Sequence, residues 1–263
     1  MRPSRRTGLT AASFALRTVG VHLGSQDVLH GVDLEIGPGE RVALVGPSGA
    51  GKTTLLRVLN GVVQPTHGAF LLDGADLTGL SGRALRAWRA RVGFVPQDHA
   101  LVPNLRVMQN VISGKLGKRG FFAALRSLVH PSAADLELAF ALLERVGIAE
   151  KLYARTDTLS GGQQQRVAIV RALFQEPEAL LADEPVASVD PARARDLVRL
   201  LAELAQERGL TLVASLHDLA LAREFFPRVI GLRDGRIVFD KPSATLDGSE
   251  VAELYRLEAA DAV

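Results

Sequence analysis

Residues Gly46 to Thr53 read GPSGAGKT and fit the pattern GxxxxGKT. In such a loop the glycines let backbone N–H groups turn inward around phosphate oxygens, the lysine brings a positive charge to the β- and γ-phosphates, and the threonine hydroxyl suits Mg²⁺. The alternative is a chance glycine turn, but the stretch follows an apolar run and precedes a helical pattern, as the motif requires. The predicted nucleotide contacts are Gly46, Pro47, Ser48, Gly49, Ala50, Gly51, Lys52, Thr53 and Thr54.

Two adjacent acids follow a second apolar run, in the stretch LLADE that ends at Glu184. Asp183, at the end of a buried strand, can hold Mg²⁺ through water, and Glu184 can orient or deprotonate an attacking water. Acids at a strand end are alternatively ordinary solvated loop residues. The phosphate loop upstream favours the catalytic interpretation, with Lys52 and Glu184 in one site.

A second glycine loop, LSGGQQQR from Leu159 to Arg166, raises the question of what it binds. Ser160 can cap the following helix, and the two glycines expose N–H groups at its start, which is an anion site. The first loop already covers one face of a γ-phosphate, so the second is expected to serve the nucleotide of another copy of the chain, across a twofold axis. The alternative is an ordinary glycine-rich cap. The predicted contacts in trans are Leu159, Ser160, Gly161, Gly162 and Gln163.

These motifs need elements that position them, and strand-like and helix-like segments alternate along the chain. A helix is predicted from Thr53 to Asn60, with Gly61 as its stop, and another from Ser160 to about Gln175, ahead of Pro177. A hairpin is predicted around Arg233-Asp234-Gly235. The predicted strands are Phe14 to Leu23, Gly31 to Ile36, Arg41 to Val45, Ala179 to Ala182, Leu210 to Leu216, Val229 to Leu232 and Arg236 to Phe239.

The middle of the chain has a different pattern. Residues 98–158 contain no convincing strand, whereas Asp135 to Val146 has apolar residues at helical spacing, with Ser132 as cap and Gly147 as stop. We therefore predict an α/β fold with a mainly parallel sheet, an N-terminal antiparallel β region and an inserted helical subdomain. The expected core is 13–97 and 159–252, and residues 1–10 form a basic tail that is expected to be disordered.

Composition limits the classes of function. The chain has 263 residues, 47% of them apolar and 23% charged, and a net charge of +2, so charge alone implies neither nucleic acid nor lipid. The absence of cysteine excludes disulfides, thiolate metal sites and a cysteine nucleophile. No apolar run is long enough to span a membrane. The N-terminus faintly resembles a secretion signal, but its apolar stretch is short and meets Arg17 at once.

As a set, these motifs resemble those of the ATP-binding subunit of ABC transporters. GPSGAGKT is similar to its Walker A motif, LSGGQ to its signature, and LLADE to its Walker B motif. The stretch Ala187 to Asp190 resembles its D-loop, Gln97 in FVPQD stands at its Q-loop glutamine, and His217 at its switch histidine. The resemblance covers roughly 14–240 and implies the P-loop NTPase fold of that family.

The resemblance also implies roles for polar residues in loops and after strands, to which the sequence pattern by itself assigns no function. Gln97 would contact Mg²⁺ or water and sense a permease, and His217 would contact the γ-phosphate beside Glu184. Asp190 would link two composite sites across the dimer. The implied cofactors are ATP and Mg²⁺. The implied catalytic set is Lys52, Glu184 and His217, and the implied metal set is Thr53, Gln97 and Asp183.

The subfamily resembled most is that of phosphonate importers, through the stretches 92–117 and 114–128. This implies an ATPase at the cytoplasmic face of the inner membrane, paired with a second copy, two permease subunits and an extracytoplasmic substrate-binding protein, and no nucleic acid. Uptake of an amino acid, a metal or another oxyanion is the alternative. A soluble ABC ATPase of repair or translation would carry a long coiled coil or two cassettes, and a P-loop kinase or GTPase would lack LSGGQ.

Two groups of residues allow two interpretations each, and several residues differ from the family pattern. Cations at Lys115, Lys118 and Arg119 face either anionic lipid or water. Where the family has an aromatic residue for adenine, this chain has Leu23, with His22 beside it, and Asp98 and Gln109 are unusual near the Q-loop. A short helix with apolar residues either packs within the insertion or forms a groove wall for a permease helix. Those residues are Phe121, Phe122, Leu125, Leu128 and Val129.

Overall fold

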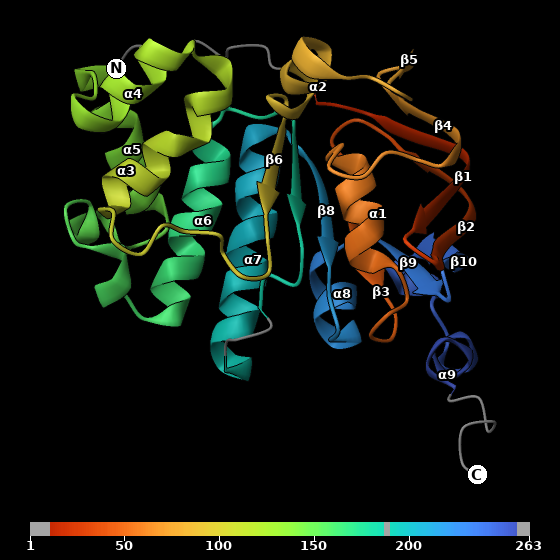
Figure 1. Cartoon of the computed structure of the whole chain (residues 1–263). Coiled ribbons are helices and arrows are strands. Elements are labelled where there is room, and N and C mark those ends of the chain that lie inside the picture. The colour runs from red at the N-terminus through yellow and green to blue at the C-terminus, as the bar shows by residue number, and fades with distance from the viewer. Residues whose placement is uncertain (1–10, 187–189, 257–263) are drawn as a thin grey trace.

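The computed structural model describes residues 11–186 and 190–256 (Figure 1). The expected tail 1–10 and the D-loop residues Ala187, Ser188 and Val189 lie outside these residues. The strands are β1 (Phe14–Leu23), β2 (Gln26–Ile36), β3 (Arg41–Val45), β4 (His67–Leu72), β5 (Ala75–Asp76), β6 (Val92–Val95), β7 (Ala179–Ala182), β8 (Thr211–Ser215), β9 (Arg228–Arg233) and β10 (Arg236–Pro242).

Helices alternate with these strands. The α-helices are α1 (Lys52–Leu59), α2 (Gly82–Arg89), α3 (Val107–Ile112), α4 (Phe121–Val129), α5 (Ala133–Arg145), α6 (Gly161–Phe174), α7 (Pro191–Arg208), α8 (Leu219–Phe225) and α9 (Gly248–Tyr255). The 3-10 helices are η1 (Ser113–Lys118), η2 (Ala149–Lys151), η3 (Thr156–Thr158) and η4 (Ser243–Thr245). No helix in 11–186 or 190–256 is both long and apolar enough to cross a membrane.

The central sheet has six strands in the order β10-β9-β3-β8-β7-β6. All neighbours are parallel except the β9–β10 hairpin at one edge. Both faces are covered, so the inner strands are mostly apolar and do not alternate with polar residues. In β3, Val42 and Leu44 pack toward α1, whereas Ala43 and Val45 pack toward the cluster that contains α6 and α7. The predicted α/β fold with a mainly parallel sheet is confirmed.

A second sheet, antiparallel and in the order β2-β1-β4-β5, covers the α1 side. Its inner residues share one apolar cluster with α1 and one face of the central sheet, so α1 lies between the two sheets. The ring of Phe70 stacks on Phe14 at 6.3 Å and meets Trp88 edge-on at 5.2 Å. The only tryptophan of the chain, Trp88 on α2, also packs against Gly61 just beyond α1, where a Cβ atom would lie 1.5 Å from the indole.

The sequence patterns did not predict strands β4, β5 and β6 or helices α2, α7, α8 and α9, and they predicted strand β2 shorter than it is. β5 has two residues and β6 four, too few to display a period, and β4 starts with exposed His67 and Gly68. Strand β2 begins at Gln26 rather than at the predicted Gly31, because it continues into a tight turn at Gly24, whose φ is +61°.

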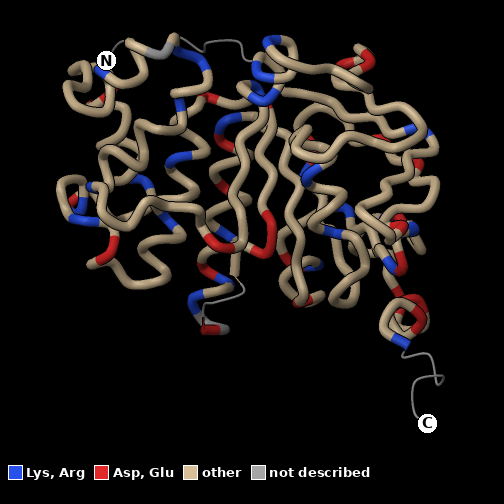
Figure 2. Tube along the Cα trace, in the orientation of Figure 1, with Lys and Arg blue, Asp and Glu red and all other residues tan. Residues whose placement is uncertain are grey.

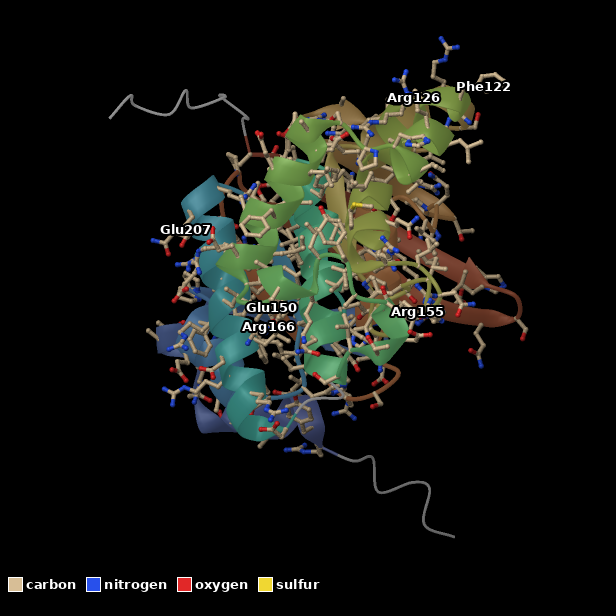
Figure 3. The ribbon with its side chains drawn as sticks, turned by 90° about the vertical axis from the view of Figure 1, so that its left-hand side faces the viewer. Phe122, Arg126, Glu150, Arg155, Arg166 and Glu207 are labelled. Carbon is tan, nitrogen blue, oxygen red and sulfur yellow. The ribbon has the colours of Figure 1, made fainter. Side chains whose placement is uncertain are left out.

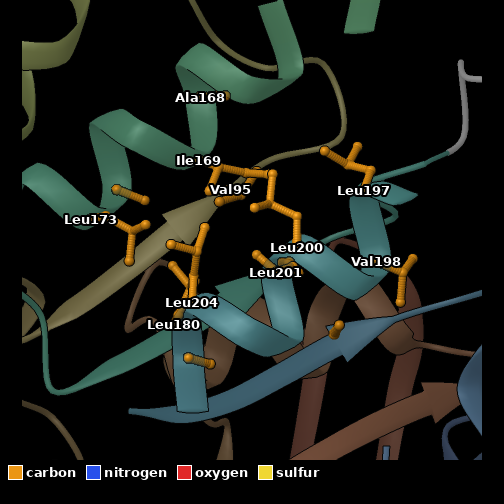
Figure 4. Packing of buried hydrophobic residues seen from close by; sticks show 14 of the residues in the cluster. Val95, Ala168, Ile169, Leu173, Leu180, Leu197, Val198, Leu200, Leu201 and Leu204 are labelled. Atoms are coloured by element: carbon orange, nitrogen blue, oxygen red, sulfur yellow. The ribbon is translucent and has the colours of Figure 1, made fainter. Parts of the chain in front are cut away.

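The insertion between β6 and β7 is helical, as predicted. The helix predicted for Asp135 to Val146 is α5, whose cap Ser132 accepts a hydrogen bond from the Asp135 amide at 3.1 Å. Gly147 follows with φ +74°. Apolar residues of α3 and α5 join one buried cluster with α6, α7 and the sheet, part of which Figure 4 shows around Ile169, Leu173 and Leu200. The subdomain boundaries at 98 and 158 remain a prediction, because this core is continuous across them.

The three cations of the insertion have partners within the chain. Lys115 forms an ion pair with Glu176 at 2.6 Å and lies 4.8 Å from the centre of the Phe174 ring. Lys118 donates to the carbonyl of Gln175 at 2.7 Å, and Arg119 binds both carboxylate oxygens of Asp135 at 2.8 Å. These contacts favour a structural role for the three residues over lipid binding. In the view of Figure 2, basic and acidic residues are interspersed along the trace.

Candidate functional site

Four neighbouring parallel strands end at the same edge of the central sheet, and each leads into a predicted motif. Strand β3 leads into the GPSGAGKT loop, β6 into Gln97, β7 into Asp183 and Glu184, and β8 into His217. The strand pairings determine where each strand ends relative to its neighbour. Leu44 lies beside Ser215, and the Asp183 amide donates to the carbonyl of Val95 at 2.9 Å. In open α/β sheets, ligands bind beyond the carboxyl ends of the strands. The sheet topology thus brings these motifs to one edge.

The loop from Gly46 to Gly51 has a shape that only glycine allows at two places. Gly46 has φ +153°, and a Cβ there would lie 2.0 Å from the carbonyl oxygen of Leu232. Gly51 has φ +100° and precedes the first turn of α1. The tip of the loop, Ser48 and Gly49, is exposed, whereas the residues on both sides are largely buried. The loop therefore presents its tip and the N-terminal amides of α1 to solvent, in the geometry that binds phosphate.

Lys52 lies inside this loop and is only 4% exposed. Its ammonium donates to the carbonyls of Gly46 at 2.8 Å and Pro47 at 2.9 Å. Burial lowers the pKa of Lys52, while the carboxylates of Glu184 and Asp183 act in the opposite direction. The lysine is thus a desolvated cation, fixed at the loop and facing the two predicted acids.

A chain of hydrogen bonds connects the phosphate loop with the two acids. The Thr53 hydroxyl donates to Asp183 Oδ1 at 3.0 Å, and the Ser215 hydroxyl donates to the same oxygen at 2.9 Å. Ser215 Oγ also accepts from the backbone amide of Glu184 at 2.8 Å. Thr53 and Asp183, predicted as metal ligands, are therefore adjacent, and buried Ser215 joins Asp183 to the backbone of Glu184.

Glu184 and His217 meet at the outer side of this network. His217 Nε2 lies 2.5 Å from Glu184 Oε1, and the histidine is about half exposed whereas the Glu184 side chain is 14% exposed. Glu184 has φ +44°, a left-handed conformation that is uncommon for a residue with a side chain. Strained backbone of this kind is concentrated at functional sites, and here the Ser215 bond helps to hold it. The two side chains predicted to stand beside the γ-phosphate therefore lie next to each other. Their contact with a nucleotide remains a prediction.

Gln97 lies at the rim of the site. It is exposed in the loop after β6, one strand beyond β7, which carries Asp183 and Glu184. Two unusual residues in or near this loop interact with their surroundings. Burial lowers the pKa of Arg171, and the negative charge of Asp98 offsets this in part. Gln109 accepts from the Arg106 amide at 3.0 Å and thereby caps α3.

The second glycine loop forms the predicted helix cap. Ser160 Oγ accepts from the Gln163 amide at 3.4 Å, and Gln163 Oε1 accepts from the Ser160 amide at 3.0 Å, which is a reciprocal capping box. Gly161 and Gly162 border open space, and Leu159 is buried beneath them. Ser160, Gly162 and Gln163 line a cavity of about 350 Å³ together with Arg166 and Arg193, and no residue of the phosphate loop takes part in it.

Asp190, the last D-loop residue, is exposed and caps α7. Its carboxylate accepts from the Arg193 amide at 3.1 Å. Within one chain, Asp190 thus acts as a helix cap. Its role in linking the two sites of a dimer remains a prediction.

Two residues near the site were not predicted. Ser215 is buried in β8, and in the sequence it is one more small residue in an apolar run, so no local signal distinguishes it. Tyr255 ends α9, and burial raises the pKa of its phenol against the effect of the Gly46 amide that faces it. Its hydroxyl is buried without a partner at hydrogen-bond geometry among the described residues. The C-terminal helix therefore reaches the back of the phosphate loop.

The β1–β2 hairpin flanks the loop on the other side. A Cβ on Gly51 would lie 3.1 Å from the carbonyl oxygen of Val28 in β2. At the hairpin tip Leu23 is 44% exposed, and His22 Nδ1 lies 2.7 Å from Asp27 Oδ1. Leu23 thus presents an apolar side chain, and His22 is engaged by an acid. Which of the two faces a base remains a prediction.

This arrangement can bind a polyphosphate, hold a cation through oxygen atoms and activate a water. Among the residues that the structure describes, no cluster of three or more His, Asp or Glu side chains could by itself hold a metal. The donor set of Thr53 and Asp183 suits a hard cation that takes its other ligands from phosphate and water.

Comparisons with known proteins agree with this geometry. The chain is 47% identical over 230 residues to the phosphonates import ATP-binding protein PhnC of Alcaligenes faecalis. The matched region covers 88% of this chain and 83% of that protein. It is 50% identical over 228 residues to phosphonates import ATP-binding protein PhnC 1 of Rhodopseudomonas palustris (strain HaA2), with 86% and 80% covered.

Solved structures give the same result. A dimeric bacterial ABC transporter cassette superposes with a TM-score of 0.76 at 32% identity, covering 88% of this chain and 98% of that one. A dimeric cassette in a post-hydrolysis state, bound to ADP and Pi, gives 0.72 at 30% identity over the same shares. The profile of the family described as ABC transporter matches residues 29–187. The site at the sheet edge, the sequence relatives and the structural neighbours thus agree, and this chain belongs to the ABC transporter family.

Proposed function

We propose that this chain is the ATP-hydrolysing subunit of an importer for phosphonate or a related phosphorus oxyanion. The observation that carries the ATPase assignment is the network from Thr53 through Asp183 and Ser215 to Glu184 and His217, next to Lys52 in the phosphate loop. The import assignment comes from the relatives, which are named phosphonates import ATP-binding proteins.

Within one chain, each residue has a role that its environment supports. The loop amides and the Lys52 ammonium bind the β- and γ-phosphates, where charge stabilisation contributes most to phosphoryl transfer. Lys52 now donates to two carbonyls, so it is already placed inside the loop. Glu184 accepts the proton of the attacking water, and His217 orients Glu184 and contacts the γ-phosphate.

Mg²⁺ fits the oxygen donors that the structure brings together. Thr53 Oγ1 and Asp183 Oδ1 lie 3.0 Å apart at the start of α1, and Gln97 stands on the neighbouring strand end. When bound, Mg²⁺ neutralises charge on the phosphate oxygens. Ser215 orients Asp183 for this contact and holds the Glu184 backbone at the same time.

The second half of the site comes from a second copy. The signature amides at Gly161 and Gly162 are open on the surface, and the phosphate loop takes no part in the cavity beside them. Two chains, each offering this helix start to the other's γ-phosphate, would complete two sites. Asp190, at the start of α7, would communicate between them.

The partners in the membrane would be two permease subunits, with the substrate supplied by an extracytoplasmic binding protein. The chain would act as a peripheral subunit at the cytoplasmic face of the inner membrane.

Helix α4 offers a contact surface: Phe122, Leu125 and Val129 are 85%, 55% and 62% exposed, and their spacing places them on one side of the helix. Phe122 projects away from the molecule in Figure 3. Leu128, expected on the same face, instead packs toward the interior, and the side chain of Phe121 lies outside the described residues.

Growth on a phosphonate as sole phosphorus source tests the transport assignment. In a host without a redundant importer, deletion of the gene should abolish growth, and the wild-type gene should restore it while Lys52→Ala should not. Growth on inorganic phosphate supplied in excess is the control for viability. Unimpaired growth of the deletion strain on phosphonate, phosphite and low phosphate would contradict the substrate class, although the ATPase assignment would stand.

A further inference from the structure

The loop that follows Gln97 has an unusual backbone. His99 and Ala100 are consecutive residues with φ of +61° and +45°, in the left-handed region that residues with a side chain rarely occupy. One backbone bond within the loop, from the His99 amide to the carbonyl of Pro96 at 3.1 Å, closes a turn. Two strained residues in a row persist only where surrounding structure holds them.

Arg171 of α6 supplies that hold. Its guanidinium donates from Nη2 to the carbonyl of His99 at 2.7 Å and from Nη1 to the carbonyl of Ala100. One planar fork thus binds both left-handed residues at once, a geometry that the point charge of lysine does not reproduce. Burial lowers the pKa of Arg171, and the carboxylate of Asp98 in the same loop offsets this in part.

The helix segment that carries Arg171 is itself fixed. A Cβ on Gly114 would lie 2.2 Å from the carbonyl oxygen of Arg171, so η1 packs directly on the α6 backbone here. Burial lowers the pKa of His99, and Gln165, six residues before Arg171 in α6 and only 1% exposed, acts on that pKa in the opposite direction. The end of the loop is tied down separately: Asn110 of α3 accepts from the Val102 amide at 2.9 Å and donates to its carbonyl at 3.0 Å.

Helix α6 begins at the signature cap Ser160, eleven residues before Arg171, or about 16 Å along the helix axis. The loop of Gln97 and the signature therefore attach to the same rigid element, one near each end. The loop belongs to the site of its own chain, whereas the signature is offered to the other copy.

We propose that Arg171 is a positioning residue for ATP hydrolysis, which sets Gln97 in its own site by fixing residues 98–100 to the signature helix. This proposal rests on the proposed function in one respect, the role of Gln97 toward the nucleotide. Movement of α6 on dimer closure then carries Gln97 with it, so that each site is adjusted when its signature is engaged by the partner.

A double-mutant cycle tests whether Arg171 acts through Gln97. Arg171→Lys keeps the charge and loses the fork, and it should lower kcat by about tenfold with the KM for ATP changed by less than about threefold. In a Gln97→Ala background the same change should have little further effect, within about twofold, because coupled residues are not additive. Independent, multiplicative losses in the double variant would overturn the proposal.

The matched control is Arg195→Lys, on the exposed face of α7, where Arg195 pairs with Glu224. It should leave kcat and KM unchanged. Circular dichroism and thermal unfolding of all variants confirm that they are folded. If Arg171→Lys does not fold, Ala100→Gly serves as the second variant, because glycine relaxes the loop without disturbing α6, and the same non-additivity with Gln97→Ala is expected.

A spectroscopic measurement reports on the loop independently of catalysis. The chain has no cysteine, so Asp98→Cys gives a unique site for a nitroxide spin label. The label should be restricted in the otherwise wild-type and Arg195→Lys proteins and clearly more mobile in Arg171→Lys. An equally restricted label in Arg171→Lys would overturn the proposal. If the label is mobilised but Gln97→Ala alone leaves kcat unchanged, the role of Gln97 in the proposed function fails, and with it the claim that Arg171 acts through Gln97.

Discussion

The two glycine loops of this chain are built in opposite ways. The GPSGAGKT loop is folded around Lys52 and connected by hydrogen bonds to residues at the ends of two other strands, β7 and β8. The LSGGQ loop satisfies itself through the reciprocal bonds of Ser160 and Gln163, and its glycines border open space. The residues of the first loop are therefore held in place by other parts of the same chain. The second loop is held only by its own bonds and leaves its glycines at the surface.

The difference shows which residues must be placed accurately by the chain itself and which contacts can be left to association. Residues that move protons and hold charge must be placed to within a fraction of an ångström, and the chain fixes them through its own sheet. A contact that must form and break in each cycle is better made between two copies, where its free energy is gained only on association. Variants that damage one half should therefore have different signatures from variants that damage the other.

The largest effect is expected from Lys52→Ala, which breaks the half-site within the chain. It removes a buried cation that no neighbour replaces, so kcat should fall by about 10²–10³-fold or more, and nucleotide binding should weaken. Steady-state ATPase assays and titration with a fluorescent nucleotide give the two numbers. Near-normal turnover would contradict the assignment of the phosphate loop.

Glu184→Gln separates chemistry from binding. The amide has the same shape but cannot accept a proton, so hydrolysis should fall by about 10²-fold or more while ATP is still bound. The protein should then accumulate as a dimer with Mg-ATP, whereas the wild type should dimerise only transiently. Light scattering that gives a strict monomer for Glu184→Gln with ATP would argue against a shared site.

The same variant provides the test of the other half. Adding Ser160→Arg to Glu184→Gln places a bulky cation at the signature cap, far from the phosphate loop of its own chain. Nucleotide binding by the monomer should persist, and the ATP-dependent dimer should be lost. A dimer that survives this substitution would mean that copies associate through another surface.

Ser215→Ala tests the connection between the acids with an intermediate effect. It removes the hydroxyl that donates to Asp183 and accepts from the Glu184 amide, in a buried position. We expect kcat to fall by about 10- to 100-fold, as for other residues that orient a ligand. Ser113→Ala, which removes a hydroxyl bonded only to the carbonyl of Asn110, is a matched control with unchanged turnover. Equal activities of the two variants would show that the Ser215 link is dispensable.

The smallest effect concerns the base of the nucleotide. Stacking on an aromatic ring is worth roughly 1–3 kcal/mol per base in single-strand nucleic-acid sites, and Leu23 offers no ring. The chain should therefore discriminate ATP from GTP by less than about tenfold, or about 1.4 kcal/mol. Leu23→Tyr should tighten ATP binding in titrations with both nucleotides. A strong adenine preference that survives Leu23→Tyr but disappears in His22→Ala would place the base on His22.

Sequence patterns predicted well where a local rule determines the structure. Strands β1, β3 and β7 have the predicted bounds, and the caps at Ser132 and Ser160 form the predicted hydrogen bonds. The family resemblance placed His217 beside Glu184, and the two side chains lie next to each other. These features depend on a few neighbouring residues or on motifs with fixed spacing.

Features that depend on distant partners were missed. Ser215 has meaning only because β8 lies between β3 and β7, which no local pattern reveals. Lys115, Lys118 and Arg119 were expected to face either lipid or water, but their partners come from the end of α6, the loop that follows it and α5. The left-handed residues His99 and Ala100 carry no glycine signal, because Arg171, more than seventy positions later, stabilises them.

The position of Trp88 makes the protein its own optical reporter. The single indole belongs to the apolar cluster between the two sheets and packs at the end of α1, whereas α3, α5, α6 and α7 form the other cluster. Its emission therefore records the loss of one cluster only, while far-ultraviolet circular dichroism is dominated by helices of the other. Coincident denaturation curves from these two signals would mean that the chain unfolds as one cooperative unit. A displacement between the curves would give separate stabilities for the β-rich and helix-rich sides without any added label.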